Sequence, residues 1–230
     1  MLKAFLFDMD GVLFDSMKNH AEAWYQTMVE HYGFISDRIH FYLYEGSTGA
    51  QTIDAMFVEQ RRRHATPEEI DRLYTEKSNC FTQLGPAEPM PGAREVLQKV
   101  GEKGLTRVLV TGSGQASLIE RLQRTYPDVF DADHIVWGRD CPIGHGKPHP
   151  DPYLMGLKKA GNLDPSEAIV IENAPMGVQA GKAAGIFTVG VNTGPLDRSV
   201  LQDAGADIVL DSMQELSDQL DEIIRMQARS

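Results

Sequence analysis

Two carboxylates two residues apart, Asp8 and Asp10, follow a short apolar run near the start of the chain. A carboxylate at such a position can attack phosphorus to form an acyl phosphate, which divides a difficult displacement into two easier steps. The second carboxylate can protonate the leaving oxygen and then take a proton from the attacking water. Because turns also favour Asp and Gly, this motif becomes specific only together with further groups.

A carboxylate that attacks a phosphate faces like-charge repulsion, so the site needs a cation, and Mg²⁺ prefers oxygen ligands. Glu172 and Asn173 follow another apolar run and supply such oxygens. The alternative is that Asn173 caps the helix expected to begin near Pro175, and the two roles are compatible. Mg²⁺ is therefore the expected cofactor.

Two further segments offer groups to a phosphoryl oxygen. Thr111, Gly112 and Ser113 end a third apolar run and present hydroxyl and backbone N–H groups, although an ordinary turn with Ser113 as a helix cap has the same residues. Lys147 lies in a loop rich in Pro and Gly. A fixed cation there would stabilise both Asp8 and the transferring group, and an exposed surface lysine is the alternative.

The elements that position these residues alternate along the chain. Short apolar runs predict buried strands at residues 2–7, 107–110, 168–171, 187–191 and 206–210. Helical periodicity predicts helices at residues 93–103, 115–124, 152–160, 175–184 and 213–225. This alternation is typical of an α/β protein with a doubly wound, mostly parallel, Rossmann-like sheet, which binds ligands at the carboxyl ends of its strands. Asp8, Thr111 and Glu172 all fall at that edge.

Residues 16–84 break the alternation, because they contain helical periodicity at 17–32, 50–64 and 67–81 and no convincing strand. We therefore expect an α-helical cap at 16–84, inserted into a core formed by residues 1–15 and 85–230. The proline-rich stretch 85–92 is a stiff connector. A module hinged at the mouth of such a sheet can act as a lid.

Composition excludes several classes of protein. The net charge of −11 opposes binding to nucleic acid or anionic lipid. The two cysteines, Cys80 and Cys141, form neither a zinc pattern nor a disulfide framework. The N-terminal run lacks the apolar length of a signal peptide or a membrane span. We expect a cytoplasmic monomer that binds no nucleic acid and no membrane.

The order Asp-x-Asp, Thr, Lys and Glu-Asn, taken as four successive strand ends, resembles the haloacid dehalogenase superfamily of phosphotransferases. The Gly-Lys-Pro-x-Pro loop, the Asp-Gly-Val-Leu-Phe-Asp-Ser start and the position of the cap resemble its β-phosphoglucomutase-like branch. The resemblance implies that Asp8 is the nucleophile, Asp10 the general acid and base, and Thr111 and Lys147 the groups that orient the phosphoryl group. It also implies that Mg²⁺ is bound by Asp8, the Asp10 carbonyl, Glu172 and Asn173, although most relatives carry Asp at position 173.

The cap departs from the mutases of this branch, which carry a Lys-Gly-x-x-Arg-like signature that holds a second phosphate. Here Glu45 stands at the Lys position and Gly49 at the Arg position. Losing both cations disfavours a sugar bisphosphate, because a bidentate arginine contact is strong. His20 and Trp24 nevertheless match the start of a mutase-like cap, and the Glu-Gly-x-Thr-Gly-Ala segment resembles a pyrophosphate-hydrolysing offshoot.

The sequence therefore predicts a phosphohydrolase for a small phosphate compound, first of all inorganic pyrophosphate. Its substrate would be contacted by His20, Glu45, Gly112 and Ser113. The alternatives are a β-phosphoglucomutase, which converts β-glucose 1-phosphate to glucose 6-phosphate, and a broad sugar-phosphate or nucleotide phosphatase. A phospho-receiver module lacks a cap and a second Asp, and a metal-free dehalogenase would not need Asp10 or the Glu172-Asn173 pair.

Overall fold

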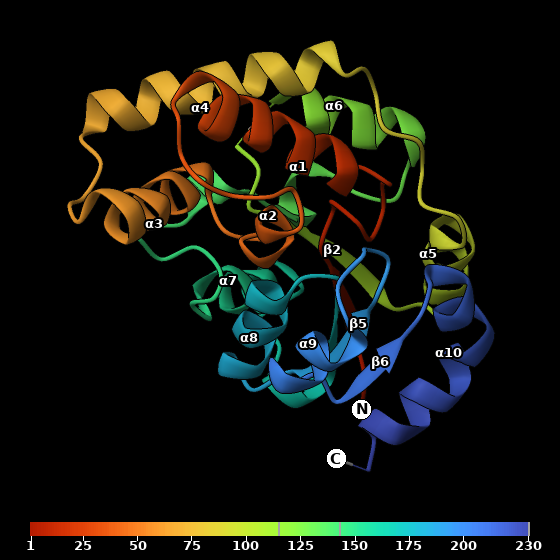
Figure 1. Cartoon of the computed structure of the whole chain (residues 1–230). Coiled ribbons are helices and arrows are strands. Elements are labelled where there is room, and N and C mark those ends of the chain that lie inside the picture. Colours follow the sequence, from red (N-terminus) through yellow and green to blue (C-terminus); the bar gives the residue numbers. More distant parts are fainter. Residues whose placement is uncertain (115, 143, 230) are drawn as a thin grey trace.

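The computed structural model (Figure 1) describes residues 1–114, 116–142 and 144–229. The early helices of the chain, in red to gold, lie above the carboxyl edge of a sheet that is covered by the later helices. Gln115, predicted to begin a helix, lies outside the described residues. The observed architecture confirms an α/β fold with a helical cap region.

Six parallel strands form the sheet in the order β3-β2-β1-β4-β5-β6. Their bounds are β1 Ala4–Phe7, β2 Thr106–Val110, β3 Ile135–Val136, β4 Ala168–Glu172, β5 Phe187–Val191 and β6 Ile208–Leu210. The sequence pattern does not predict β3, because two residues are too few to show a period. In β6, pairing with β5 begins at Ile208, two residues after the predicted start.

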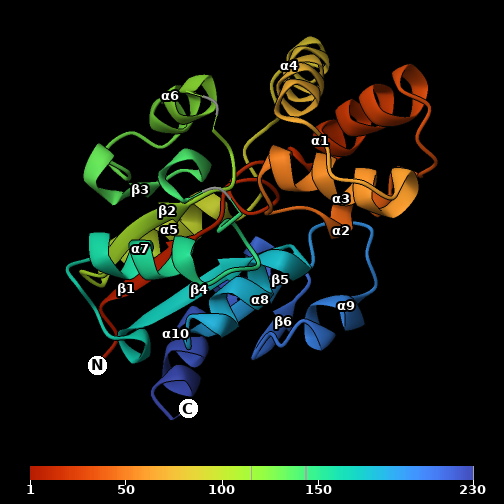
Figure 2. The same cartoon turned by 90° about the vertical axis from the view of Figure 1, so that its left-hand side faces the viewer.

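Helices cover both faces of the sheet because side chains of a strand alternate between its faces. Phe5 and Phe7 of β1 pack in one apolar cluster and Ala4 and Leu6 in another. The first cluster includes α5 Ala93–Glu102, α6 Ala116–Thr125 and α10 Met213–Gln227, and the second α7 Asp151–Lys159 and α8 Pro175–Ala183. Helix α9 Arg198–Asp203 contacts β6. Figure 2 shows α7 and α8 in front of the sheet.

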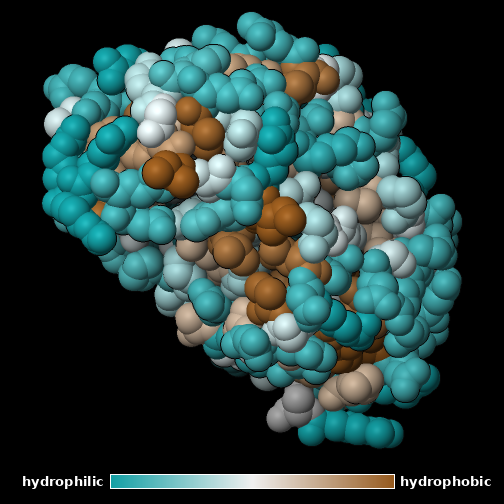
Figure 3. All heavy atoms as spheres, viewed as in Figure 1, coloured by the Kyte–Doolittle hydropathy of each residue, from teal (hydrophilic) through white to brown (hydrophobic). Residues whose placement is uncertain are grey.

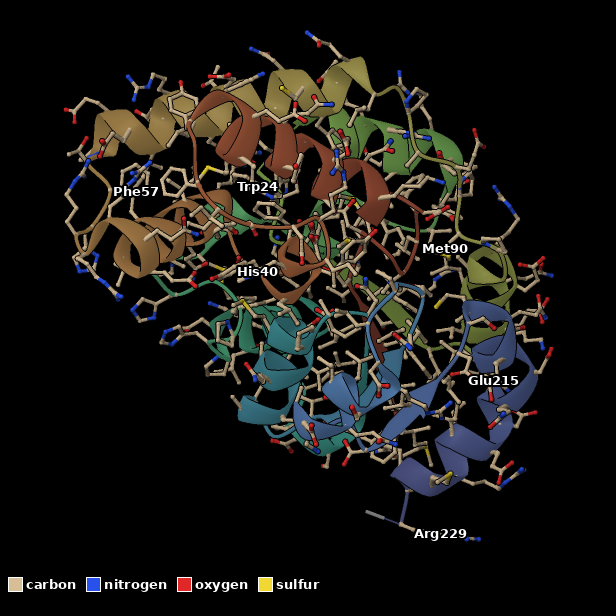
Figure 4. All side chains as sticks on the ribbon, viewed as in Figure 1. Trp24, His40, Phe57, Met90, Glu215 and Arg229 are labelled. Atoms are coloured by element: carbon tan, nitrogen blue, oxygen red, sulfur yellow. The ribbon has the colours of Figure 1, made fainter. Side chains whose placement is uncertain are left out.

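The cap consists of α1 Met17–Trp24, the π-helix η1 Tyr25–His31, α2 His40–Leu43, α3 Gly49–Arg61 and α4 Pro67–Gln83. Its core includes Trp24, Phe41, Phe57 and Leu73, and Figure 4 shows Trp24 and Phe57 between the cap helices. Helix α3 ends before residue 64, the predicted end, because Arg62 adopts a left-handed conformation with φ 57°.

Two chain segments join the cap to the core, and they lie side by side. Asp15 N–H donates to the Glu88 carbonyl at 2.9 Å, and Met90 N–H donates to the Leu13 carbonyl at 2.9 Å. Because both segments are tied at the same place, the cap and core are joined at one narrow hinge. The domain boundaries at 15/16 and 84/85 stay predictions.

The remaining regular elements are the short 3-10 helices η2 Ala132–His134, η3 Gly138–Asp140 and η4 Pro165–Glu167. Figure 3 shows that hydrophilic residues cover most of one face, while hydrophobic ones gather near its middle, where the cap meets the core. Within the described residues, no helix combines the length and the apolar character that crossing a bilayer requires.

Candidate active site

The carboxyl edge of the sheet brings three predicted site residues together. Asp8 directly follows β1, and its N–H donates to the Ile171 carbonyl of β4 at 3.0 Å. Thr111 follows β2, and Glu172 is the last residue of β4. All three side chains are buried, as expected where neighbouring parallel strands end at the same edge.

Lys147 connects two of these strands. Its Nζ donates to Asp8 Oδ1 at 2.6 Å, to Glu172 Oε1 at 2.6 Å and to the Val110 carbonyl at 2.9 Å. Burial alone would lower the pKa of Lys147, but the carboxylates of Asp8 and Glu172 raise it above its usual value. The surface-lysine alternative is wrong, because the side chain is 1% exposed. The expected place at a strand end is also wrong, since Lys147 lies in the long connection between β3 and α7.

Burial disfavours the charged form of Asp8 more than Lys147 compensates. Burial, together with Glu172 and Asp10, raises the pKa of Asp8 to about 7 against the opposite effect of Lys147. A low pKa would require a further positive charge at this place. The site is therefore electrostatically suited to a cation close to Asp8.

Glu172 and Asn173 differ in how their oxygens are used. Glu172 Oε1 accepts hydrogen bonds from Lys147 and from Tyr153 OH at 2.6 Å, and Oε2 accepts from Asn173 N at 3.1 Å. Asn173 Oδ1 is buried and has no hydrogen-bond partner among the described residues. It does not cap α8, whose N-cap is Ala174 without a side-chain bond, so that alternative is wrong. A buried amide oxygen without a partner suits a hard metal ion.

Asp10 is oriented by residues that the cap supplies. Its Oδ1 accepts from Ser16 Oγ at 2.5 Å and lies 3.2 Å from His20 Nε2. Lys77 Nζ of α4 lies 2.6 Å from His20 Nδ1. Because an ammonium group only donates, Nδ1 is the acceptor and Nε2 carries the proton, although Nε2 lacks hydrogen-bond geometry toward Asp10 and has no hydrogen-bond partner among the described residues. Burial and Lys77 lower the pKa of His20, which favours this neutral form.

Lys77 was not predicted as a site residue, and it changes the interpretation of the cap. It is 3% exposed and lies 5.1 Å from the Trp24 ring and 5.0 Å from the Phe81 ring. Burial lowers the pKa of Lys77 to about 8 against the opposite effect of Glu45 and Asp10. The cations at positions 45 and 49 are missing as the sequence shows, but α4 supplies another cation, Lys77, that lies far from Glu45 in sequence.

A pocket between the cap and the core brings together seven predicted residues and Lys77. The predicted residues in its lining are Asp8, Asp10, His20, Glu45, Thr111, Gly112 and Ser113. Its cavity volume of about 40 Å³ corresponds to roughly three waters, since one water needs about 10–15 Å³. Lys147, Glu172 and Asn173 are not part of that lining, and Lys147 contacts Asp8. The closed pocket thus fits a compact group.

The cap loop closes tightly over this pocket. A side chain at Gly112 would begin 2.6 Å from the Gly46 carbonyl of the cap loop, so only glycine permits this approach.

Thr111 Oγ1 accepts from Ser113 N–H at 3.1 Å, which leaves the hydroxyl proton of Thr111 to be donated elsewhere. Glu45 is partly buried, and desolvation with Asp10 and Asp8 close by raises its pKa well above its usual value.

At Gly49, the ring of Tyr74 from α4 occupies the space that a side chain would take. A Cβ atom there would lie 2.2 Å from the Tyr74 ring. An arginine at this position would therefore have to displace an aromatic ring from the cap core. The packing of the Tyr74 ring against Gly49 is thus incompatible with an arginine at this position.

Comparisons with known proteins agree with this geometry. A family model described as haloacid dehalogenase-like hydrolase matches residues 2–185. A phosphorylated carbohydrates phosphatase of Thermotoga maritima is 30% identical over 225 residues, which cover 97% of this chain and 100% of that protein. Hexitol phosphatase A of Escherichia coli is 28% identical over 225 residues, covering 94% of this chain and 93% of that protein.

Among solved structures, a protein of Bacteroides vulgatus named as a candidate β-phosphoglucomutase is similar over the whole chain. The two share 48% identity with a TM-score of 0.92, and the match covers 100% of this chain and 91% of the other. The similarity therefore includes the cap as well as the core. The names of these relatives lend no support to the pyrophosphate preference expected from the Glu45 segment.

Proposed function

Because the chain belongs to the haloacid dehalogenase-like hydrolases, we propose that it is a phosphatase in which Asp8 takes a phosphoryl group from a small phosphate compound. The proposal depends on one observation above all. Asp8 lines the pocket, and the ammonium group of Lys147 contacts Asp8 Oδ1 at 2.6 Å. A buried cation at this distance orients a carboxylate and stabilises charge that develops next to it.

The reaction needs two displacements at phosphorus. Asp8 forms a bond to phosphorus while the ester P–O bond breaks, and Asp10 gives its proton to the leaving oxygen. Asp10 then takes a proton from a water molecule, whose oxygen attacks phosphorus and breaks the aspartyl–phosphate bond. Inorganic phosphate leaves, and Asp8 is restored. Thr111 and Ser113 orient the phosphoryl oxygens, Lys147 orients Asp8, and the hydrogen bond from Ser16 Oγ holds the Asp10 carboxyl group, with His20 beside it.

Mg²⁺ is the cofactor that this donor set fits. Asp8, the Asp10 carbonyl and the partnerless oxygen of Asn173 would hold it, all of them oxygen donors of the kind that Mg²⁺ prefers. When bound, the ion supplies positive charge that reduces repulsion between Asp8 and the phosphate. Glu172 is occupied by Lys147 and Tyr153, so its part in the metal site is smaller than the family pattern implies.

The first substrate class is a phosphorylated small sugar or polyol. The relatives named above act on phosphorylated carbohydrates and hexitols. In the pocket, Glu45, His20 and Lys77 offer charged and polar groups opposite the reacting edge, and such groups hydrogen-bond hydroxyls. A hexose phosphate is larger than the closed cavity, so its binding requires that the cap first opens.

Pyrophosphate is the second candidate, and two observations favour it. The closed cavity is small, and its described lining, which includes Gly49, contains no arginine that could hold a distant phosphate. Glu45 beside Asp8 and Asp10 would help to bind a substrate that brings its own metal ion. A monomeric state remains the expectation for either substrate class.

Phosphate release with Mg²⁺ separates these candidates. The panel is fructose 1-phosphate, a hexitol phosphate, β-glucose 1-phosphate and pyrophosphate, each as kcat/KM. A kcat/KM that is about tenfold higher for one substrate than for the others, equal to about 1.4 kcal/mol of transition-state stabilisation, identifies the preferred class. Conversion of β-glucose 1-phosphate to glucose 6-phosphate without phosphate release would contradict both candidates, because it would make the protein a mutase.

A further inference from the structure

Three metal-ligating side chains gather on the loop that carries Lys147, outside the pocket. They are His145, His149 and Asp151, and one ligand atom of each lies within 4.8 Å of the others. We propose that these three residues form a second metal site, which takes a transition-metal ion such as Zn²⁺.

The distances suit such an ion. In a tetrahedral zinc site with bonds of about 2.0–2.1 Å, ligand atoms lie about 3.3 Å apart. His145 Nδ1 and Asp151 Oδ2 are 3.4 Å apart, which already corresponds to that spacing. The two imidazole rings lie 5.2 Å apart with an interplanar angle of 30°. The third ligand atom lies within 4.8 Å of the other two, and an exposed side chain is free to rotate toward the tetrahedral spacing.

The ligand types distinguish this site from the pocket. Two imidazoles and one carboxylate suit Zn²⁺, Ni²⁺ or Cu²⁺, whereas Mg²⁺ prefers oxygens only. His145 and Asp151 have side-chain exposures of 51% and 38%, so water can complete the coordination. The two sites should therefore bind different ions from the same solution.

The backbone limits how far the ligands can move apart. His145 N–H donates to the Pro142 carbonyl at 2.9 Å, and His149 N–H donates to the Gly146 carbonyl at 3.0 Å. Pro148 and Pro150 flank His149 and fix its neighbours' φ angles. Asp151 is the first residue of α7, where its carboxylate also stabilises the N-terminus of the helix. A bound cation opposes that helix end, so we expect an affinity in the micromolar range.

The site matters because Lys147 lies between its two histidines. Lys147 is the residue that joins Asp8 to Glu172. An ion that links His145 to His149 and to α7 would fix both ends of this short segment. We expect bound Zn²⁺ to raise the unfolding temperature, since a ligand that binds only the folded state stabilises it.

Calorimetric titration of the whole chain with Zn²⁺, in excess Mg²⁺ to fill the oxygen-rich pocket, tests the proposal. We expect one Zn²⁺ per chain and at least tenfold weaker binding in His149→Ala and in Asp151→Asn. His134→Ala is the matched control, because His134 Nδ1 also faces a carboxylate, Asp131 Oδ1, at 2.8 Å. It should bind Zn²⁺ like the wild type.

Co²⁺ in place of Zn²⁺ gives a second readout, since its absorption spectrum reports nitrogen ligands. Loss of that spectrum in His149→Ala, with an unchanged spectrum in His134→Ala, supports the site. Absence of Zn²⁺ binding by the wild type, or equal binding by His149→Ala and the wild type, overturns it. None of these outcomes depends on phosphatase activity, so they leave the proposed function untouched.

Discussion

Two buried lysines lie beside the two aspartates, Lys147 in contact with Asp8 and Lys77 near Asp10, and they are stabilised in different ways. Lys147 of the core contacts two carboxylates and a carbonyl, all within 2.9 Å. Lys77 of the cap contacts a neutral imidazole and two aromatic rings. The pKa of Lys147 is raised by its carboxylates, whereas burial lowers that of Lys77 to about 8.

This difference separates the two halves of the site. In the core, the ammonium group of Lys147 is paired with the carboxylates of Asp8 and Glu172, so its position is fixed before a substrate binds. The cap holds a cation whose charge is only partly offset, and an anionic or polar substrate group would complete its surroundings. We infer that the core supplies the chemistry and the cap supplies the choice of substrate.

Replacing Lys147 with Met should have the largest effect. It leaves Asp8 and Glu172 buried without their shared partner, which costs about 3–5 kcal/mol of unfolding free energy. The kcat should fall by about 10²–10³-fold, since a fixed charge next to the reacting group is lost. Urea unfolding and steady-state kinetics measure the two effects. A stability loss below about 1 kcal/mol would contradict the central place given to this lysine.

Replacing Lys77 with Met should separate function from stability. Because a desolvated charge is removed, we expect the unfolding free energy to stay within about 1 kcal/mol of the wild type. The kcat/KM for the preferred substrate should fall by about 10–100-fold, the value of one charged hydrogen bond. Lys18→Met is the control, since Lys18 pairs with Asp15 on the surface. Equal losses for every substrate in the panel would refute a role in selection.

The places of Asp8, Thr111 and Glu172 could be predicted from the sequence, because these residues follow apolar runs whose parallel arrangement is fixed by the alternation of strands and helices. Lys77 could not, since its partner His20 lies 57 residues away and a lysine in a helix usually faces water. A signal existed, because Leu73, Lys77, Cys80 and Phe81 form the buried stripe of α4. Tyr153 was missed for a similar reason, since a buried tyrosine in α7 suggests packing only.

Replacing Tyr153 with Phe removes one donor from Glu172. The unfolding free energy should fall by about 1–2 kcal/mol, and kcat by about tenfold, because Glu172 then holds Lys147 less firmly. Tyr126→Phe is the matched control, as Tyr126 OH is also buried and donates to the Leu13 carbonyl at 2.7 Å. It should lose similar stability while keeping kcat. If both variants keep kcat, Tyr153 is merely structural.

Replacing Thr66 with Ala should have the smallest effect. Thr66 begins α4, which carries Lys77, and its hydroxyl accepts from Glu69 N–H in a capping box. Its loss should cost about 1 kcal/mol, which lowers the unfolding temperature by about 2–4 °C, with kcat unchanged. A thermal scan measures the shift. A fall in kcat would contradict this expectation, because it would mean that fraying at the start of α4 displaces Lys77.

The most direct test of the account is to trap the phosphoryl group on the enzyme. The preferred substrate, labelled in its phosphoryl group, is mixed with excess enzyme and quenched in acid, and the labelled peptide is identified. We predict a label on Asp8 in the wild type and in Lys77→Met, and neither label nor turnover in Asp8→Asn. A label on another residue, or turnover by a folded Asp8→Asn variant, would contradict the assignment of Asp8 as the nucleophile.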